Sequence, residues 1–302
     1  MNSAKIFARI AAALVCLAAS ASLAATHPLN QPMGLAVDAK GNLYVANHGG
    51  NQILVYNPTA QQMTAKTITT NINGPMQLTF DAQGNLWVAN LNSGSTSVEY
   101  FSEYGPNGKP INTAYTSNAG ASFIVPAFAV DGVGDLWISD IEGTGQPFLV
   151  AQNGPGIYNG GGVIDVFYEQ PGTYTAVAAH GPWIAMGTAT SASWELVGSL
   201  LGGNLDLHFL GSSGNPGNGV LAMIFDNNGN LYYATDQGYG VSGVWFVNIP
   251  TAAAPSLNVN VGYRLSGMAV DSVHGRLYLS NASTNKIEIY STSTWLLVGT
   301  IQ

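Results

Sequence analysis

The chain has 302 residues, of which 46% are hydrophobic and only 8% are charged, and its formal net charge is −8 at pH 7. Eight Lys and Arg residues cannot supply the clustered basic surface that nucleic acids or anionic membranes attract, so neither is expected as a partner. Beyond the N-terminus no stretch approaches about 18 uninterrupted apolar residues, so no membrane span is predicted.

Residues 1–25 have the three features of a cleaved secretory signal peptide. Lys5 and Arg9 precede an apolar run over 10–19, and small residues follow up to Ala25. A secreted or periplasmic protein is therefore expected, with cleavage between Ala21 and Thr26. Cleavage would remove Cys16, the one cysteine of the chain, and with it any disulfide or thiolate metal site. A lipid anchor on Cys16 is the alternative, although Val15 stands where a small residue is wanted.

One sequence motif occurs five times along residues 26–302, which are expected to form a single domain. A unit of this length cannot bury an apolar face alone, so it must stack against copies of itself. The five copies read GLAVDAKGNLYVAN from Gly34, QLTFDAQGNLWVAN from Gln77, AFAVDGVGDLWISD from Ala127, AMIFDNNGNLYYATD from Ala222 and GMAVDSVHGRLYLSN from Gly267.

Each copy is predicted to be a β-hairpin. An apolar stretch leads to an aspartate such as Asp38, then to a polar turn with a glycine such as Gly41, where positive φ costs glycine little. The aspartate can accept hydrogen bonds from the turn amides. Leucine and an aromatic residue follow, as in Leu43 and Tyr44, and strand geometry points them to opposite faces. A sheet buried on both faces by similar sheets is a propeller blade.

The spacing of the turn aspartates predicts the number of blades. The intervals are 43 residues from Asp38 to Asp81, 50 to Asp131, 95 to Asp226 and 45 to Asp271. The interval of 95 holds one further, eroded repeat. The expected fold is therefore all-β, a six-bladed β-propeller of four-stranded antiparallel blades, with the fourth blade eroded at about 175–215.

Two segments depart from the repeat. Residues 140–162 read as an insertion between the second and third strands of their blade, and such irregular loops often carry binding. In the eroded blade, PWIAMGT, SWELVG and LDLHFL are interpreted as the three inner strands, with a short helix over 193–201 as the competing interpretation.

Polar residues end the second strand of each repeat and are expected to ring the mouth of the central channel. Their oxygens could hold Ca²⁺, but each could equally bond the amides of its own loop, as Asn and Asp do in turns. The residues are Asn47, Asn90, Asp140, Thr235 with Asp236, and Asn281.

Histidines add a second candidate chemistry at the same mouth. His48 follows Asn47, and His180 is placed just before the inner strand of the eroded blade, so a Zn²⁺ or general-base group with a nearby carboxylate is conceivable. His274 falls in an opposite-face turn and is excluded. Apolar lining is expected from Pro147 and Phe148. The predicted ligand-binding residues are His48, Asn90, Asp140, Glu142, Tyr158 and His180.

The residue pattern of the repeats resembles that of the NHL-repeat β-propellers, over roughly residues 31–302. That group includes gluconolactonase-like propellers. The resemblance implies a metal-binding glutamate at the start of the first inner strand, where this chain has Gln31-Pro32-Met33-Gly34. Streptogramin-lyase-like propellers end the second strand with an acid, where this chain has Trp87-Val88-Ala89-Asn90. Neither enzyme signature is present at these places.

The sequence therefore favours a monomeric, secreted binding or interaction module over an enzyme. Its ligand is expected to be a protein, a small molecule or a carbohydrate. A metal-dependent lyase or hydrolase, lactonase-like and with its site at the channel mouth, is the alternative. No nucleophile elbow or HExxH motif supports a specific reaction.

Overall fold

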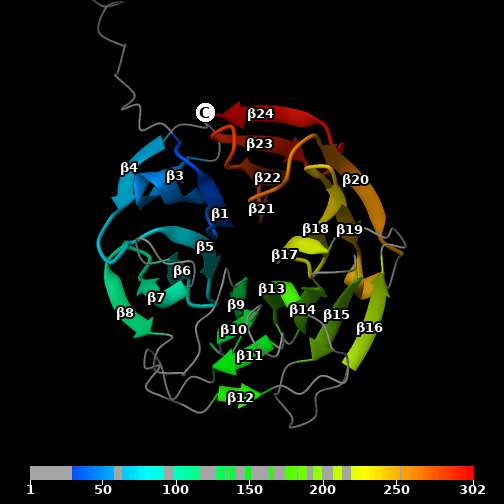
Figure 1. Ribbon diagram of the computed structural model, residues 1–302, viewed down its shortest axis with the longest axis horizontal. Helices are drawn as coiled ribbons and strands as arrows, with labels where there is room; N and C mark the ends of the chain where they lie inside the picture. The colour runs from blue at the N-terminus through cyan, green and yellow to red at the C-terminus, as the bar shows by residue number, and fades with distance from the viewer. Residues whose placement is uncertain are drawn as a thin grey trace, which may run out of the picture.

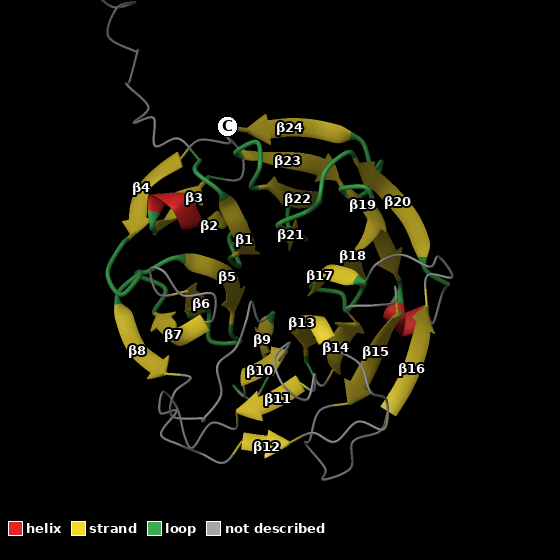
Figure 2. Ribbon diagram, in the orientation of Figure 1, coloured by secondary structure: helices red, strands yellow, loops and turns green. Residues whose placement is uncertain are grey.

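The computed structural model describes residues 29–57, 63–91, 98–115, 127–132, 134, 136–139, 147–150, 163–165, 174–181, 183–188, 193–198, 207–212, 219–251 and 254–302. Their regular secondary structure is β-strand apart from two short 3-10 helical turns, η1 (His48–Gly50) and η3 (Ile249–Thr251). Figure 2 shows the strands in yellow around a central axis. No helix in the described part of the chain is long and apolar enough to span a membrane.

The described strands form six antiparallel sheets of four strands each. In Figure 1 the sheets stand in a ring, with the first strand of each sheet innermost, so the predicted all-β propeller is confirmed. The sheets are β1–β4 (Pro32–Val37, Leu43–Asn47, Gln52–Tyr56, Met63–Ile68), β5–β8 (Pro75–Phe80, Leu86–Leu91, Val98–Tyr104, Pro110–Tyr115), β9–β12 (Phe128–Val130, Leu136–Ser139, Pro147–Val150, Val163–Asp165), β13–β16 (Tyr174–His180, Trp183–Thr188, Ser193–Gly198, Leu207–Ser212), β17–β20 (Val220–Phe225, Leu231–Gly238, Val241–Val247, Ser256–Val261) and β21–β24 (Gly267–Asp271, Arg276–Asn281, Lys286–Ser291, Leu297–Ile301).

The leucine–aromatic pair of each repeat holds neighbouring sheets together. Leu43 is 1% exposed and packs in a cluster with Ala269 and Tyr278 of the last sheet. Tyr44, the next residue, is 5% exposed and packs toward the second sheet, in a cluster with Leu78. The two side chains therefore bury opposite faces of one strand, as the sequence pattern predicts.

The turn aspartates act as the predicted caps of the hairpins. Asp81 Oδ1 accepts hydrogen bonds from the amides of Gln83 (3.0 Å) and Asn85 (2.8 Å). Its Oδ2 accepts from Asn85 Nδ2 (3.0 Å) and from Trp87 Nε1 (3.2 Å). The glycine of the same turn, Gly84, has φ of +79°, a conformation that a side chain would strain. Residue types and backbone therefore agree in this turn.

The ring closes between the first and last sheets without exchange of strands, because each sheet is a continuous piece of chain. Closure depends instead on contacts between residues about 250 positions apart. Ser280 Oγ donates to the carbonyl oxygen of Met33 at 2.7 Å, and the amide of Gln31 donates to Asn285 Oδ1 at 2.7 Å. Glycine at 267 lets the backbones of β21 and β1 approach closely.

The structure corrects two interpretations of the irregular segments. The proposed insertion at 140–162 contains β11, the third strand of its sheet, so Pro147 and Phe148 belong to a strand rather than to a loop. In the eroded repeat the innermost strand is β13, and the three segments read as inner strands are the second, third and fourth. The competing helix is wrong over 193–198, which is β15. Strand β13 lacks the turn pattern that follows the other inner strands, which is Asp-x-x-Gly in four repeats and Asp-x-x-x-Gly after β21.

Candidate functional site

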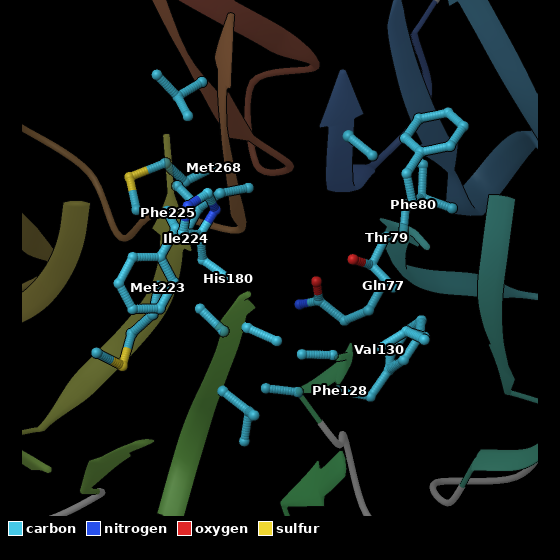
Figure 3. A pocket seen from close by; sticks show the side chains of 18 of the residues that line it. Gln77, Thr79, Phe80, Phe128, Val130, His180, Met223, Ile224, Phe225 and Met268 are labelled. Atoms are coloured by element: carbon cyan, nitrogen blue, oxygen red, sulfur yellow. The ribbon is translucent and has the colours of Figure 1, made fainter. Parts of the chain in front are cut away.

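A cavity of about 390 Å³ lies on the axis of the ring, between the innermost strands of all six sheets. Figure 3 shows side chains from these strands converging on it. Most of its lining residues are apolar, although somewhat more polar than apolar surface faces the space, and the lining reaches the hairpin turns that end the inner strands. The main apolar side chains are Val37, Phe80, Val130, Ile224, Phe225, Met268 and Val270, and the turn residues are Asp81, Asp131, Gly181, Asp226 and Asn227.

Repetition makes this cavity nearly symmetric, and polar residues at single positions break the symmetry: His180, Gln77 and, two residues after Gln77, Thr79. The turn position carries aspartate in five repeats and His180 in β13–β14. Four residues earlier the inner strand carries a small residue in five repeats and Gln77 in the sixth. The small residues are Gly34, Ala127, Ala176, Ala222 and Gly267.

His180 is the last residue of β13, at the hairpin end of the cavity, where it pairs with Trp183. Its half-buried ring packs against Phe225 of the next sheet, with ring centroids 5.8 Å apart. Among the described residues its ring nitrogens have no hydrogen-bond partner. The expected placement of His180 at the mouth, beside His48, is therefore wrong. The inner strand is β13 rather than β14, and His180 ends this strand instead of preceding it. Since a strand ends on the face opposite to the one where it begins, His180 lies away from the mouth.

Gln77 lies on β5, at the cavity end nearer the start of the inner strands, and its amide extends into the cavity in Figure 3. Within the described part of the chain this half-buried side chain also makes no hydrogen bond. The wall beside it is tight, since a Cβ on Gly34 would lie 2.6 Å from Gln77 Cα. Sequence reasoning missed Gln77, although the small residues at the equivalent positions were a signal.

The predicted mouth residues mostly hold loops and linkers. Asn90 is fully buried: its Oδ1 accepts from the Asn73 amide at 3.0 Å, and its Nδ2 donates to Val88 O and Ser102 Oγ, both at 3.2 Å. Likewise, Asn47 Oδ1 accepts from the Asn30 amide at 2.6 Å. In these two sheets the bonds tie the chain that enters the sheet to its second strand, so both residues do bond backbone amides, but of the preceding linker rather than of their own loop.

His48 does lie at the mouth end, in η1, where its Nδ1 is 3.3 Å from the carbonyl oxygen of Pro75 at the start of β5. It is thus at the opposite end of the inner strands from His180, and the two do not form one group. Asp140, Glu142 and Tyr158 lie outside the described residues. Among the residues that are described, no three His, Cys, Asp or Glu side chains converge to hold a metal ion, so the Ca²⁺ or Zn²⁺ site stays a prediction.

Glu103 is an acid at a position that other sheets fill with apolar residues. It pairs with Trp87 across β6 and β7, where Tyr44 pairs with Val55 and Tyr232 with Phe246. The residue is 4% exposed, and its Oε2 has no hydrogen-bond partner in the described part of the structure. Burial, reinforced by the nearby Asp81 charge, raises the pKa of Glu103, while the Asn85 amide opposes the shift.

Replacement of Glu103 by glutamine is therefore expected to stabilise the fold at pH 7, by about 1 kcal/mol, because a buried charge loses its desolvation cost. Because its pKa is raised, the Glu103 carboxyl stays protonated in the folded protein at pH values where it has ionised in the unfolded chain. The free energy of unfolding of the wild type therefore falls as pH rises above about 4.5. Urea unfolding from pH 4 to 8 should show this slope for the wild type and a flatter one for E103Q.

Glu288→Gln is the matched control, since Glu288 Oε2 accepts hydrogen bonds from the hydroxyls of Tyr263 (3.1 Å) and Tyr290 (2.8 Å). That substitution should destabilise or have no effect. A wild-type slope retained in E103Q would show that Glu103 is not its source.

Comparisons with known proteins agree with this fold. The family model for the NHL repeat matches residues 29–56, which run from the chain before β1 to the end of β3. The resemblance to NHL-repeat propellers predicted from the sequence is thereby confirmed. No curated protein matches the sequence significantly.

Solved structures with the same fold include three enzymes of known type. An inactive variant of virginiamycin B lyase from Staphylococcus aureus, solved with quinupristin, has a TM-score of 0.56 at 12% identity, covering 90% of this chain and 85% of that one. A gluconolactonase from Xanthomonas campestris has a TM-score of 0.60 at 13% identity, covering 84% and 85%. Hydrazine synthase from Kuenenia stuttgartiensis has a TM-score of 0.53 at 12% identity, covering 89% and 80%. At these identities the likeness concerns the fold alone.

Proposed function

We propose that this NHL-repeat β-propeller is a binding module that takes a small molecule into the axial cavity, with each of the six sheets serving as one blade of a closed ring. The observation that carries the proposal is the cavity itself. It is about 390 Å³ in volume, is lined mostly by apolar residues, and contains two polar side chains, Gln77 and His180, that lack protein partners among the described residues. A concave apolar site with a few convergent polar groups is typical of small-molecule binding.

The site differs from the one expected from the sequence. A ligand at the mouth was predicted because residues 140–162 were interpreted as one long loop. The cavity instead reaches the hairpin face, and its asymmetry comes from single residues on the inner strands. We also propose that the protein is exported, since residues 1–25 have the pattern of a signal peptide.

Binding in the cavity can be tested with N-phenyl-1-naphthylamine, an uncharged probe that fluoresces in apolar surroundings. The protein should bind it saturably, and Ala222→Phe should weaken binding at least roughly tenfold by filling the axis. Ala222 is half-buried and lines the cavity. Leu257→Phe, which adds an aromatic ring on outer strand β20, should leave affinity unchanged. Equal loss in both variants, or none in either, would place the probe outside the cavity.

A metal-dependent lyase or hydrolase acting at the channel mouth is the second candidate. What favours it is the fold shared with a lyase and a lactonase, together with Asp140 and Glu142, which follow β10 in the sequence. Metal analysis of the purified mature protein decides between the candidates: stoichiometric Ca²⁺ or Zn²⁺ supports the enzyme, and a metal-free protein that binds the apolar probe supports the binding module.

A further inference from the structure

The two unpartnered polar side chains lie at different depths of the cavity. Gln77 is four residues before its turn aspartate, whereas His180 occupies the turn position itself. Four residues of strand span roughly 13 Å. Between these two levels the lining is mostly apolar, with Phe80, Val130 and Ile224 among its residues, although Thr79 also lies there. A ligand that meets both polar groups must therefore be elongated, with an apolar middle.

Charge distinguishes the two ends. At the level of His180 the cavity is also lined by Asp81, Asp131 and Asp226. Uncharged groups donate hydrogen bonds to these carboxylates: Trp137 Nε1 to Asp131 at 3.0 Å, Trp87 Nε1 to Asp81 at 3.2 Å and Asn230 Nδ2 to Asp226 at 2.8 Å. No Lys or Arg is among the lining residues that the structure describes. A concave opening lined by charge of one sign concentrates counter-ions there.

We propose, on the basis of the binding function above, that the ligand is an amphipathic organic amine. Its ammonium group lies at the hairpin end, within reach of His180 and the carboxylates, and its apolar body lies along the axis toward Gln77. The amide of Gln77 can donate or accept a hydrogen bond at the far end. Carboxylates alone would not define this site; the apolar cavity and the two unpartnered side chains do, and the carboxylates set the sign of the ligand charge.

Three dansyl probes with the same ring and a five-carbon chain can test the charge preference. Dansylcadaverine ends in an ammonium, N-pentyl dansylamide is uncharged, and 6-(dansylamino)hexanoate ends in a carboxylate. Fluorescence titration should show the ammonium probe binding roughly tenfold more tightly than the uncharged one, and the carboxylate probe most weakly. The preference should shrink at about 1 M NaCl, where the Debye length is about 3 Å.

Variants of one turn provide a matched pair for the same titration. Asn227 and Asn228 are both exposed, but only Asn227 is among the residues that line the cavity. Asn227→Lys should abolish the preference for the ammonium probe while the uncharged probe still binds. Asn228→Lys adds the same charge one residue away and should have a much smaller effect. His180→Ala and Gln77→Ala should each weaken dansylcadaverine several-fold.

The outcomes separate this inference from the proposed function. If the uncharged probe binds as tightly as dansylcadaverine, and N227K changes neither, the cavity binds apolar molecules but the amine preference is wrong. If no probe of any charge binds, or binding is insensitive to A222F, the proposed function itself fails.

Discussion

Replacing Trp87 with alanine is expected to lower the free energy of unfolding by about 3–5 kcal/mol. Trp87 is 1% exposed and packs between the second and third sheets, in a cluster with Phe101 and Phe128. Its indole also donates to Asp81 Oδ2 at 3.2 Å, so the substitution removes both a large buried side chain and a bond to the hairpin cap. The alanine would leave a void between the second and third sheets. Because each interface of a ring is shared by two sheets, this void cannot close unless one of the two sheets moves.

Equilibrium denaturation in urea measures this effect, and Trp87→Tyr is the control. Tyrosine occupies the equivalent positions at Tyr44 and Tyr232, which are also buried, so W87Y should lose far less stability than W87A. Equal denaturation midpoints for the two variants would show that the interface does not depend on the volume of this side chain.

The second large effect concerns ring closure. Gly267→Ala should destabilise the protein by about 2–3 kcal/mol, because the added Cβ would overlap the carbonyl oxygen of Met33 and approach Gly34 Cα to 3.0 Å. These are backbone atoms of β1, which cannot move aside as a side chain can. The substitution therefore pushes the first and last sheets apart at the junction that holds no shared strand.

Gly262→Ala is the matched control, since a Cβ there meets no described atom within 4 Å. Thermal unfolding of the two variants should differ by several degrees, with G262A close to wild type. A G267A protein as stable as G262A would mean that the first and last sheets are not packed as closely as the structure has them.

The repeat made most of the fold predictable, because the same turn chemistry and the same buried pair recur in five copies. Asp38 and Asp81, for example, cap their turns with the same bonds. The irregular repeats were harder to interpret. In β13–β14 only two residues separate His180 from its partner Trp183, and without the usual aspartate and glycine the hairpin could not be recognised. The inner strand was therefore assigned one strand too late.

That single shift also explains why His180 was predicted on the wrong face. In a propeller, successive strands run in opposite directions, so assigning β14 as the innermost strand moved His180 from one end of the channel to the other. Asn90 was selected because polar residues recur where second strands end, but recurrence is what a structural cap requires. Gln77 was overlooked because it lies inside an apolar strand. It stands out only when the inner strands are aligned, since the equivalent position of the other five carries glycine or alanine.

The position of a bound ligand tests the central claim most directly. A crystal structure of the mature protein with dansylcadaverine should show the probe on the ring axis, with its dansyl group toward Gln77 and its ammonium beside His180. A probe bound at the opposite face, next to His48 and the segment 140–162, would contradict the axial site and restore the mouth of the channel as the functional face.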